Sequence, residues 1–201
     1  SLCKLKKNLI YGVLIHNPQS LNIKSSEIII DYLNQLKKKG LIKKVGISIY
    51  NRKDLEIFDL KKIDIVQLPL SIYDQRLIKD GTLKILSKNN IDIHVRSIFL
   101  QGLILEKPNK WPSFINDSFK DHHQNFSIFL SENSITPLEA TFIFLNSLNG
   151  IDSVIVGISN KKELQDICNA WNNASKLKQR INKFQNWAWD EKRFLDPRNW
   201  P

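Results

Sequence analysis

Five short apolar segments recur along the chain, and each is rich in β-branched residues. Runs of this length, bounded by glycine, proline or polar residues, are typical of buried strands. The predicted strands are residues 9–15, 42–49, 63–68, 91–98 and 151–156.

The segments between these strands place apolar residues three and four positions apart, which is the spacing of an amphipathic helix. The first such helix is expected to begin at Ser25–Glu27 with a serine N-cap and to end at a C-cap glycine, Gly40. Asn51, and Ser159 or Asn160, are expected to cap later helices. The predicted helices are residues 25–39, 52–60, 77–88, 119–131, 136–148, 160–170 and 175–187, with a helix tail at 1–8, a loop at 102–116 and an irregular tail at 187–201.

Strands and helices in regular alternation predict a parallel α/β sheet. An open doubly wound sheet usually carries a glycine-rich phosphate turn after its first strand, and no GxGxxG occurs here. The alternative is a partial (β/α)₈ TIM barrel, which when complete has eight units in about 250 residues. We therefore expect the five C-terminal βα units of a barrel, with the first three units absent. Residues 1–201 should form one domain, with barrel units to 175 and a helix and tail over 176–201.

Composition narrows the class of protein. No apolar run approaches the ~20 residues of a membrane span, and the isolated Cys3 and Cys168 suit a reducing cytoplasm. The net charge of +10 comes largely from lysines near predicted helix ends, so we expect no nucleic-acid partner. The chain contains no methionine, so Ser1 is not an unprocessed translation start. We expect either removal of the first residues or a piece of a longer protein.

His16 is the main candidate for chemistry. It ends the first predicted strand, because Pro18 cannot continue a ladder, and we expect both faces of that strand to be covered. Catalytic side chains collect at the carboxyl ends of such strands, although a plain core or surface histidine is the competing interpretation. Gln67, at the end of another apolar strand, needs partners for its amide. The adjacent His122 and His123 cannot converge on one ion from a helix, so no metal site is predicted.

Five segments together resemble the aldo-keto reductase family. They are Leu-Ile-His-Asn-Pro at 14–18, Gly-Leu-Ile-Lys-Lys-Val-Gly-Ile-Ser at 40–48, Ile-Val-Gln at 65–67, His-Val-Arg-Ser-Ile-Phe-Leu-Gln-Gly-Leu at 94–103 and Val-Ile-Val-Gly-Ile-Ser-Asn at 154–160. The family folds as a (β/α)₈ barrel and reduces carbonyls with NADPH. The resemblance thus implies an NAD(P)H-dependent oxidoreductase with a small-molecule carbonyl substrate, while the oligomeric state stays unknown.

The resemblance also assigns residues. It makes His16 the active-site histidine that orients and polarises the substrate carbonyl. The residues implied to bind the cofactor are Ser48 and Gln67 at the nicotinamide carboxamide, Arg96 where many members stack an aromatic ring, Ser97, Phe99 and Gln101 over the pyrophosphate, and Gly157, Ser159 and Asp166 at the adenosine end. Glu163 stands where NADP-preferring members carry an arginine for the 2′-phosphate. We therefore expect NADPH with substantial use of NADH.

Three departures qualify this assignment. Ile49 replaces the usual asparagine after Ser48. Arg96 replaces the aromatic residue that many members stack on the nicotinamide. His94, which alternates with Arg96 and is not one of these departures, is expected to support the site residues or to be structural. The family's catalytic Asp, Tyr and Lys precede the histidine strand and have no counterpart here, so the isolated chain is not expected to be active. A second hypothesis is a non-catalytic remnant that binds a nucleotide or protein partner. A third is an open α/β binding protein unrelated to the family.

Residues 96–102 resemble the corresponding motif of a bacterial branch of the family associated with surface-sugar biosynthesis, which implies a sugar-like substrate.

Overall fold

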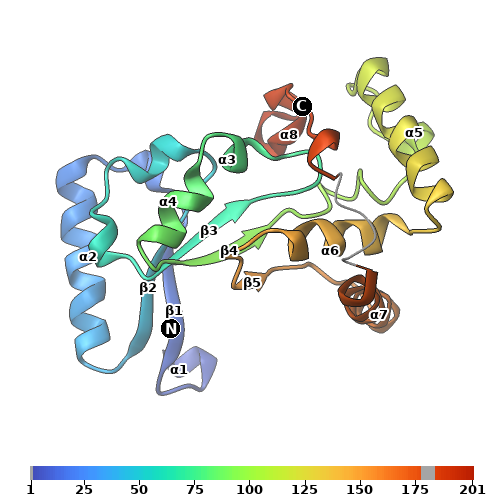
Figure 1. Cartoon of the computed structure of the whole chain (residues 1–201). Helices are drawn as coiled ribbons and strands as arrows, with labels where there is room; N and C mark the ends of the chain where they lie inside the picture. The colour runs from blue at the N-terminus through green and yellow to red at the C-terminus, as the bar shows by residue number, and fades with distance from the viewer. Residues whose placement is uncertain (1, 178–183) are drawn as a thin grey trace. The chain divides into compact units, whose positions relative to one another are not determined.

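The computed structural model describes residues 2–177 and 184–201 (Figure 1). The chain divides into two compact units. The first unit comprises Ser1–Pro69, Arg76–Arg96 and Gly150–Val154, and the second comprises Leu70–Gln75, Ser97–Asn149 and Ile155–Pro201. The single domain expected over residues 1–201 stays a prediction. Within the described ranges, no helix combines the length and the apolar character that a membrane span requires.

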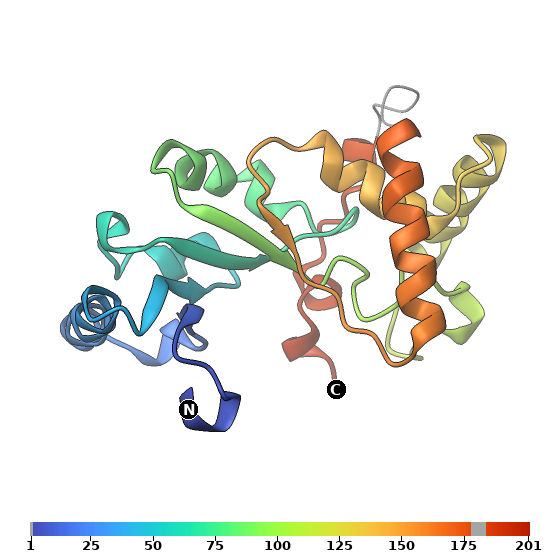
Figure 2. The ribbon, with the colours of Figure 1, turned by 90° about the horizontal axis from the view of Figure 1, so that it is seen from below.

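The first unit contains a five-stranded parallel sheet whose strands follow one another in chain order (Figure 1, Figure 2). The strands are β1 (Ile10–Ile15), β2 (Ile42–Ser48), β3 (Ile65–Pro69), β4 (Asp92–Arg96) and β5 (Ser153–Val154). A doubly wound sheet reverses its strand order at a switch point, and the described sheet has no reversal. Parallel neighbours in chain order are the arrangement of a (β/α)₈ barrel. All five predicted strands are found, although β5 spans two residues rather than six.

Two helices of the first unit lie along the sheet, α2 (Ile23–Lys38) beside β2 and α4 (Thr82–Lys88) beside β4 (Figure 1). The shorter helices are α1 (Leu2–Leu5) and α3 (Arg76–Lys79). The predicted serine N-cap of α2 is wrong. Asn22 caps the helix, because its side chain accepts from the Ser25 N–H at 2.9 Å while the Ser25 hydroxyl accepts from the Asn22 N–H at 3.1 Å.

The helix predicted over residues 52–60 is also wrong, since the segment forms two 3₁₀ turns, Arg52–Leu55 and Leu60–Lys62. The Asp54 carboxylate accepts from the backbone N–H groups of Tyr50 and Asn51 at 2.7 and 3.1 Å. Because those bonds close a tight turn, the backbone hydrogen bonds of a longer helix do not continue through this segment.

The helix predicted over residues 77–88 is two helices, because Gly81 has a φ of +78° and separates α3 from α4. The carboxylate of Asp80 accepts from both the backbone N–H and the hydroxyl of Thr82 at 2.9 and 2.6 Å. This aspartate satisfies donors at the start of α4, which therefore begins as a separate helix.

The two faces of the sheet differ in chemistry. The side chains that face the helices are fully buried aliphatics, namely Val45, Ile47, Val66, Leu68, Ile93 and Val95. Side chains alternate between faces along a strand, so Gly46, Ser48, Gln67 and His94 lie on the opposite face. The register places Ser48 opposite Gln67 and Gln67 opposite His94. Polar groups thus run across three neighbouring strands on this face.

Carboxylates tie the amino-terminal ends of the strands to their neighbours. Asp64, just before β3, accepts from the Val45 N–H at 2.8 Å, and Asp152, just before β5, accepts from the Ile93 N–H at 2.8 Å. Asp64 also pairs with Lys37 of α2 at 2.6 Å. These bonds stabilise one end of the sheet and leave the carboxyl ends of the strands for other roles.

The second unit is helical and has an aromatic core. Its helices are α5 (Asp117–Glu132), α6 (Pro137–Ser147), α7 (Lys161–Leu177) and α8 (Lys192–Leu195), and its 3₁₀ turns are Pro108–Lys110, Phe184–Trp187 and Pro197–Asn199. Tyr73 is fully buried and meets Phe119 and Phe126 edge-on at 5.3 and 5.6 Å between ring centroids. Trp189 stacks on Phe119 at 4.8 Å and donates its backbone N–H to the Tyr73 carbonyl at 2.9 Å. The C-terminal segment therefore packs on α5.

Two sequence expectations for this unit need correction. The helix predicted to end at Ala170 continues to Leu177, because nothing in its sequence, such as a glycine or proline, stops it earlier. The tail predicted to be irregular over 187–201 contains the short helix α8 and the 3₁₀ turn Pro197–Asn199. Residues 178–183 of the helix predicted over 175–187 lie outside the described residues, and 184–187 form a 3₁₀ turn.

Candidate functional site

His16 directly follows β1, and its side chain is exposed. The expectation that both faces of this strand are covered is wrong, because its residues are at most half buried and Tyr11 is 54% exposed. In the described chain β1 pairs only with β2 and stands at the edge of the sheet. Ile15 pairs with Ile47, so His16 lies beside the end of β2 that carries Ser48.

Ser48 and Gln67, predicted from separate strands, meet across β2 and β3. The Ser48 hydroxyl donates to Gln67 Oε1 at 3.3 Å. Ser48 is 3% exposed, whereas Gln67 is half-buried. This close approach depends on Gly46, where an added Cβ would lie 2.5 Å from the Ile65 carbonyl oxygen. In this arrangement the oxygen of the Gln67 amide faces Ser48.

The guanidinium of Arg96 lies over the aromatic ring of Tyr50. Its guanidinium carbon is 4.1 Å from the centroid of Tyr50, and Nη2 donates to the Ile49 carbonyl at 3.2 Å. The Ile49 side chain is fully buried, on the side of the core. Tyr50 was not predicted as part of this site, and its only sequence signal is its position two residues after Ser48. A planar cation on an aromatic ring thus stands at the carboxyl end of β4.

His94, expected to be structural, lies in the same row as Gln67 and beside a polar network. Its ring lies parallel to that of Tyr11, with centroids 6.4 Å apart and planes at 11°. The Tyr11 hydroxyl donates to Asp92 at 3.3 Å, and Asp92 also pairs with Lys44. The hydrogen bond to Asp92 raises the pKa of the Lys44 ammonium. Alternation with Arg96 is the one sequence signal that could have linked His94 to the site.

In the second unit, Ser97, Phe99 and Gln101 share one loop. Ser97, Leu100 and Gln101 have φ values of +58°, +46° and +55°, which non-glycine residues rarely adopt. Phe99 packs edge-on against Phe142 of α6 at 6.2 Å, while Gln101 is exposed. A loop held in such conformations costs free energy that the surrounding structure must offset, and such loops concentrate at binding sites.

Gly157, Ser159 and Asp166 are exposed around the start of α7. The Ser159 N–H donates to Glu163 Oε2 at 2.7 Å, and Asn160 exchanges two bonds with Glu163 at 2.9 Å each. Asn160, one of the two predicted caps, therefore caps α7 together with Glu163. The Glu163 carboxylate occupies a backbone donor that an anion would otherwise meet there.

His122 and His123 serve separate hydrogen bonds. His122 Nε2 lies 3.0 Å from the Trp187 carbonyl, and His123 Nδ1 lies 2.6 Å from the Tyr73 hydroxyl. Burial lowers the pKa of His123 to about 4 and raises the pKa of Tyr73 well above its usual value. In the described ranges, no three histidine, cysteine or acidic side chains gather as metal ligands would.

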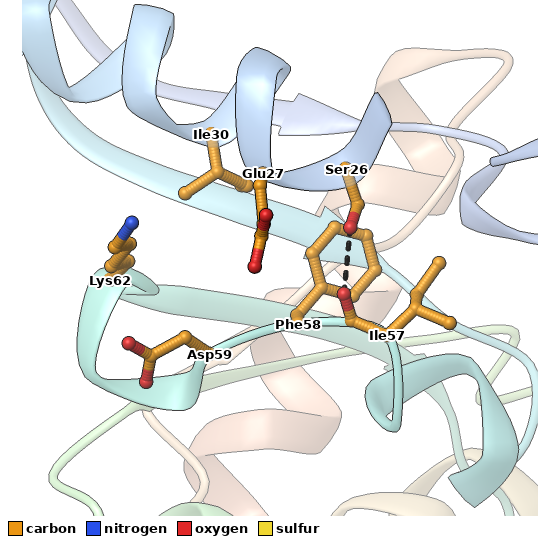
Figure 3. A pocket seen from close by; sticks show the side chains of 7 residues that line it. All are labelled: Ser26, Glu27, Ile30, Ile57, Phe58, Asp59 and Lys62. Atoms are coloured by element: carbon orange, nitrogen blue, oxygen red, sulfur yellow. Dashed lines mark hydrogen bonds between the residues drawn. The ribbon is translucent and has the colours of Figure 1, made fainter. Parts of the chain in front are cut away.

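One hollow opens between α2 and the segment after β2 (Figure 3). It encloses about 180 Å³, part of it open to solvent, and is lined by Ser26, Glu27, Ile30, Ile57, Phe58, Asp59 and Lys62. The Ser26 hydroxyl already lies 2.7 Å from the carbonyls of Ile23 and Ile57. None of the predicted site residues lines this hollow, so it offers no support for the predicted chemistry.

Comparisons with known proteins agree with this architecture. The chain is similar to the aldo-keto reductase AKR11C1 from Bacillus halodurans, solved in a holo form, with 19% identity and a TM-score of 0.74 over 97% of this chain and 67% of that chain. It is also similar to the glycerol dehydrogenase AKR11B4 from Gluconobacter oxydans, with 15% identity and a TM-score of 0.60 over 90% of this chain and 64% of that chain. A comparison with curated proteins gives no match.

At these identities the structural likeness shows the fold, and it confirms the partial barrel. The chain spans about two thirds of the length of these structures, as the coverages of 67% and 64% show. A sequence model of the aldo/keto reductase family matches residues 1–186, which is most of the chain. The chain therefore belongs to the aldo/keto reductase family, whose members are oxidoreductases.

Proposed function

We propose that this chain forms the nicotinamide-facing part of an NAD(P)H-dependent reductase that converts a carbonyl into an alcohol by hydride transfer. Family membership supports the oxidoreductase class. The observation that carries the proposal is the position of His16, Ser48 and Gln67 at the carboxyl ends of three neighbouring parallel strands. In (β/α)₈ enzymes this end of the barrel holds the chemistry.

The groups at these strand ends suit a nicotinamide carboxamide, which presents one hydrogen-bond acceptor and two N–H donors. The Ser48 hydroxyl bonds Gln67 Oε1, which leaves the NH₂ group of Gln67 to donate to a ligand oxygen. The nicotinamide, when bound, would supply the hydride that reduces the carbonyl carbon. His16 would donate a hydrogen bond to the carbonyl oxygen, where negative charge develops.

The proton that the carbonyl oxygen takes up needs a separate donor. The family's donor tyrosine has no counterpart in residues 1–201, and positioned proton transfer is typically worth about 10²–10⁴ in rate. We therefore expect residues 1–201 alone to show no carbonyl reduction above background. A complete polypeptide, in which the missing barrel units are restored as a longer natural reading frame or as a graft from a relative, should show it. The 96–102 motif supports a sugar-like carbonyl as substrate.

NADPH is the expected cofactor, with substantial use of NADH, because the carboxylate of Glu163 repels a 2′-phosphate. Lys161 and Lys162, at the start of α7, partly offset this repulsion. We expect the protein to act in the cytoplasm, where its two free, exposed cysteines would stay reduced.

Paired substitutions in the complete polypeptide test the proposal. His16→Ala should lower kcat for carbonyl reduction with little change in the Kd for NADPH, because His16 faces the substrate oxygen. Gln67→Ala should raise the Kd and change kcat less. Hydride transfer is followed with NADPH deuterated at C4, whose label must appear on the product carbinol carbon. Turnover by residues 1–201 alone, or a complete enzyme indifferent to His16→Ala, would contradict the assignment.

A second candidate function is nucleotide binding without turnover, as in a non-catalytic remnant. The absence of a matching tyrosine in residues 1–201 favours it. It predicts NADPH binding by the complete polypeptide with no label transfer to any carbonyl offered. The sequence upstream of Ser1 discriminates directly, since an in-frame Asp, Tyr and Lys at barrel spacing favours the enzyme.

A further inference from the structure

A polar row crosses the face of the sheet opposite α2 and α4 in the first unit. Ser48, Gln67, His94 and Ser153 are register partners on β2, β3, β4 and β5. Neighbouring strands lie about 4.8 Å apart, so Gln67 and His94 project from adjacent positions on one face. The row begins at the hydrogen bond between Ser48 and Gln67, two of the three strand-end residues that carry the proposed function.

The His94 side chain is half-buried. Its Nε2 atom is buried, and no hydrogen-bond partner for it exists among the described residues. A buried polar atom without a partner costs on the order of 1–3 kcal/mol, so such an atom usually meets a ligand, a water or a further group. The ring itself is held, because Tyr11 lies parallel to it and is anchored by its bond to Asp92.

The donors and acceptors along the row form a definite sequence. The Ser48 hydroxyl donates to Gln67 Oε1, so the Gln67 NH₂ group points onward as a donor. The next strand then offers His94 Nε2, which accepts in one neutral tautomer of the imidazole. A primary carboxamide complements this pair, since its oxygen accepts from Gln67 and its NH₂ group donates to His94.

We propose that His94 is a further cofactor-binding residue, whose Nε2 binds the nicotinamide carboxamide opposite Gln67. The inference rests on the proposed function and adds to it a residue from β4. It assigns the buried nitrogen a partner, and it gives the Tyr11–Asp92–Lys44 network the role of holding the imidazole in place.

The test measures by titration calorimetry the affinity of the complete polypeptide for three ligands. They are NADH, NADPH and ADP-ribose, which lacks the nicotinamide. His94→Phe keeps the ring that packs on Tyr11 and removes the nitrogen. It should weaken NADH and NADPH by about tenfold, the worth of one hydrogen bond, and leave ADP-ribose unchanged. His94→Gln restores an acceptor and should recover most of the loss. Ser153→Ala, one strand further along the same row, is the matched control and should bind all three ligands as the wild type does.

A second measurement covers the case in which His94→Phe does not fold. In wild-type protein labelled with ¹⁵N-histidine, NADH should shift the Nε2 resonance of His94, and ADP-ribose should not. Equal NADH affinity in foldable His94→Phe, equal weakening of ADP-ribose, or no NADH-specific shift overturns the role of His94 while the proposed function stands. If the wild type binds neither NADH nor ADP-ribose, the proposed function fails and the role of His94 fails with it.

Discussion

Acid should weaken the aromatic core of the second unit through one buried histidine. His123 is 3% exposed, and its Nδ1 lies 2.6 Å from the Tyr73 hydroxyl oxygen. Burial lowers the pKa of His123 from 6.5 to about 4, outweighing the opposing effect of its hydrogen bond to the Glu106 backbone. Between these two values the imidazole is neutral in the folded protein, whereas the unfolded chain binds a proton there.

The sign and the magnitude follow from that difference. A folded-state pKa below the unfolded value means that protonation favours unfolding, so the contribution is complete above pH 6.5 and is lost as the pH falls towards 4. One pKa unit corresponds to 1.36 kcal/mol, so the shift from 6.5 to about 4 is worth about 3 kcal/mol in total. A loss of that size is a large fraction of the stability of a typical domain.

Urea unfolding followed by tryptophan fluorescence tests this, with wild type and His123→Gln compared at neutral pH and near pH 4.5. The glutamine amide oxygen can still accept from the Tyr73 hydroxyl but does not titrate. Carboxylates titrate alike in both proteins, so the difference between them isolates His123. The wild type should lose about 2–3 kcal/mol more than the variant on acidification. Parallel losses in the two proteins would refute the reasoning.

Three further predictions concern backbone and charge. Gly46→Ala should destabilise the protein by about 1–3 kcal/mol, because its Cβ meets the Ile65 carbonyl at 2.5 Å; Gly157→Ala, which meets nothing within 4 Å, should change urea stability by no more than about 0.5 kcal/mol. Gln101→Gly relieves a φ of +55°, so the melting temperature should hold or rise; a clear fall would show that the side chain supports the loop. Glu163→Arg in the complete polypeptide should raise the affinity for NADPH relative to NADH, with Glu163→Gln as the neutral control. An unchanged affinity ratio would mean that the side chain does not face the adenosine.

The features predicted from the sequence are those that neighbouring residues determine, such as helix starts and strands. The helix predicted over 136–148 is α6, whose start is set locally by a capping box in which Thr136 and Glu139 bond reciprocally. The strands were also predicted, because a buried parallel strand is a nearly continuous apolar run. The order of segments predicted the family, and the chain-ordered sheet agrees with it.

The features that the sequence did not predict depend on contacts between residues far apart in the chain. The carboxylate of Asp54 turns the chain after β2 and also accepts from Gln19 at 3.2 Å, a partner 35 residues away. Nothing local distinguishes that aspartate from one in a helix. The position of Arg96 over Tyr50 likewise depends on two strands that flank β3. The proposed role of His94 depends on register, which is set by pairing across strands rather than by the sequence around it, so the sequence alone did not predict it.

The order of the strands bears on how the protein folds as it leaves the ribosome. Each strand pairs with the one synthesised just before it, so β1 to β4 can assemble in the order of translation. The steps are local until β4, since Gly46 pairs with Ile65 and Ile65 with Asp92. The next step is longer, because His94 pairs with Ser153 only after α5 and α6 have been made. During that interval the far edge of β4 carries unpaired backbone groups, a state prone to misassembly. Chaperone binding to the nascent chain should therefore peak between the emergence of β4 and that of β5.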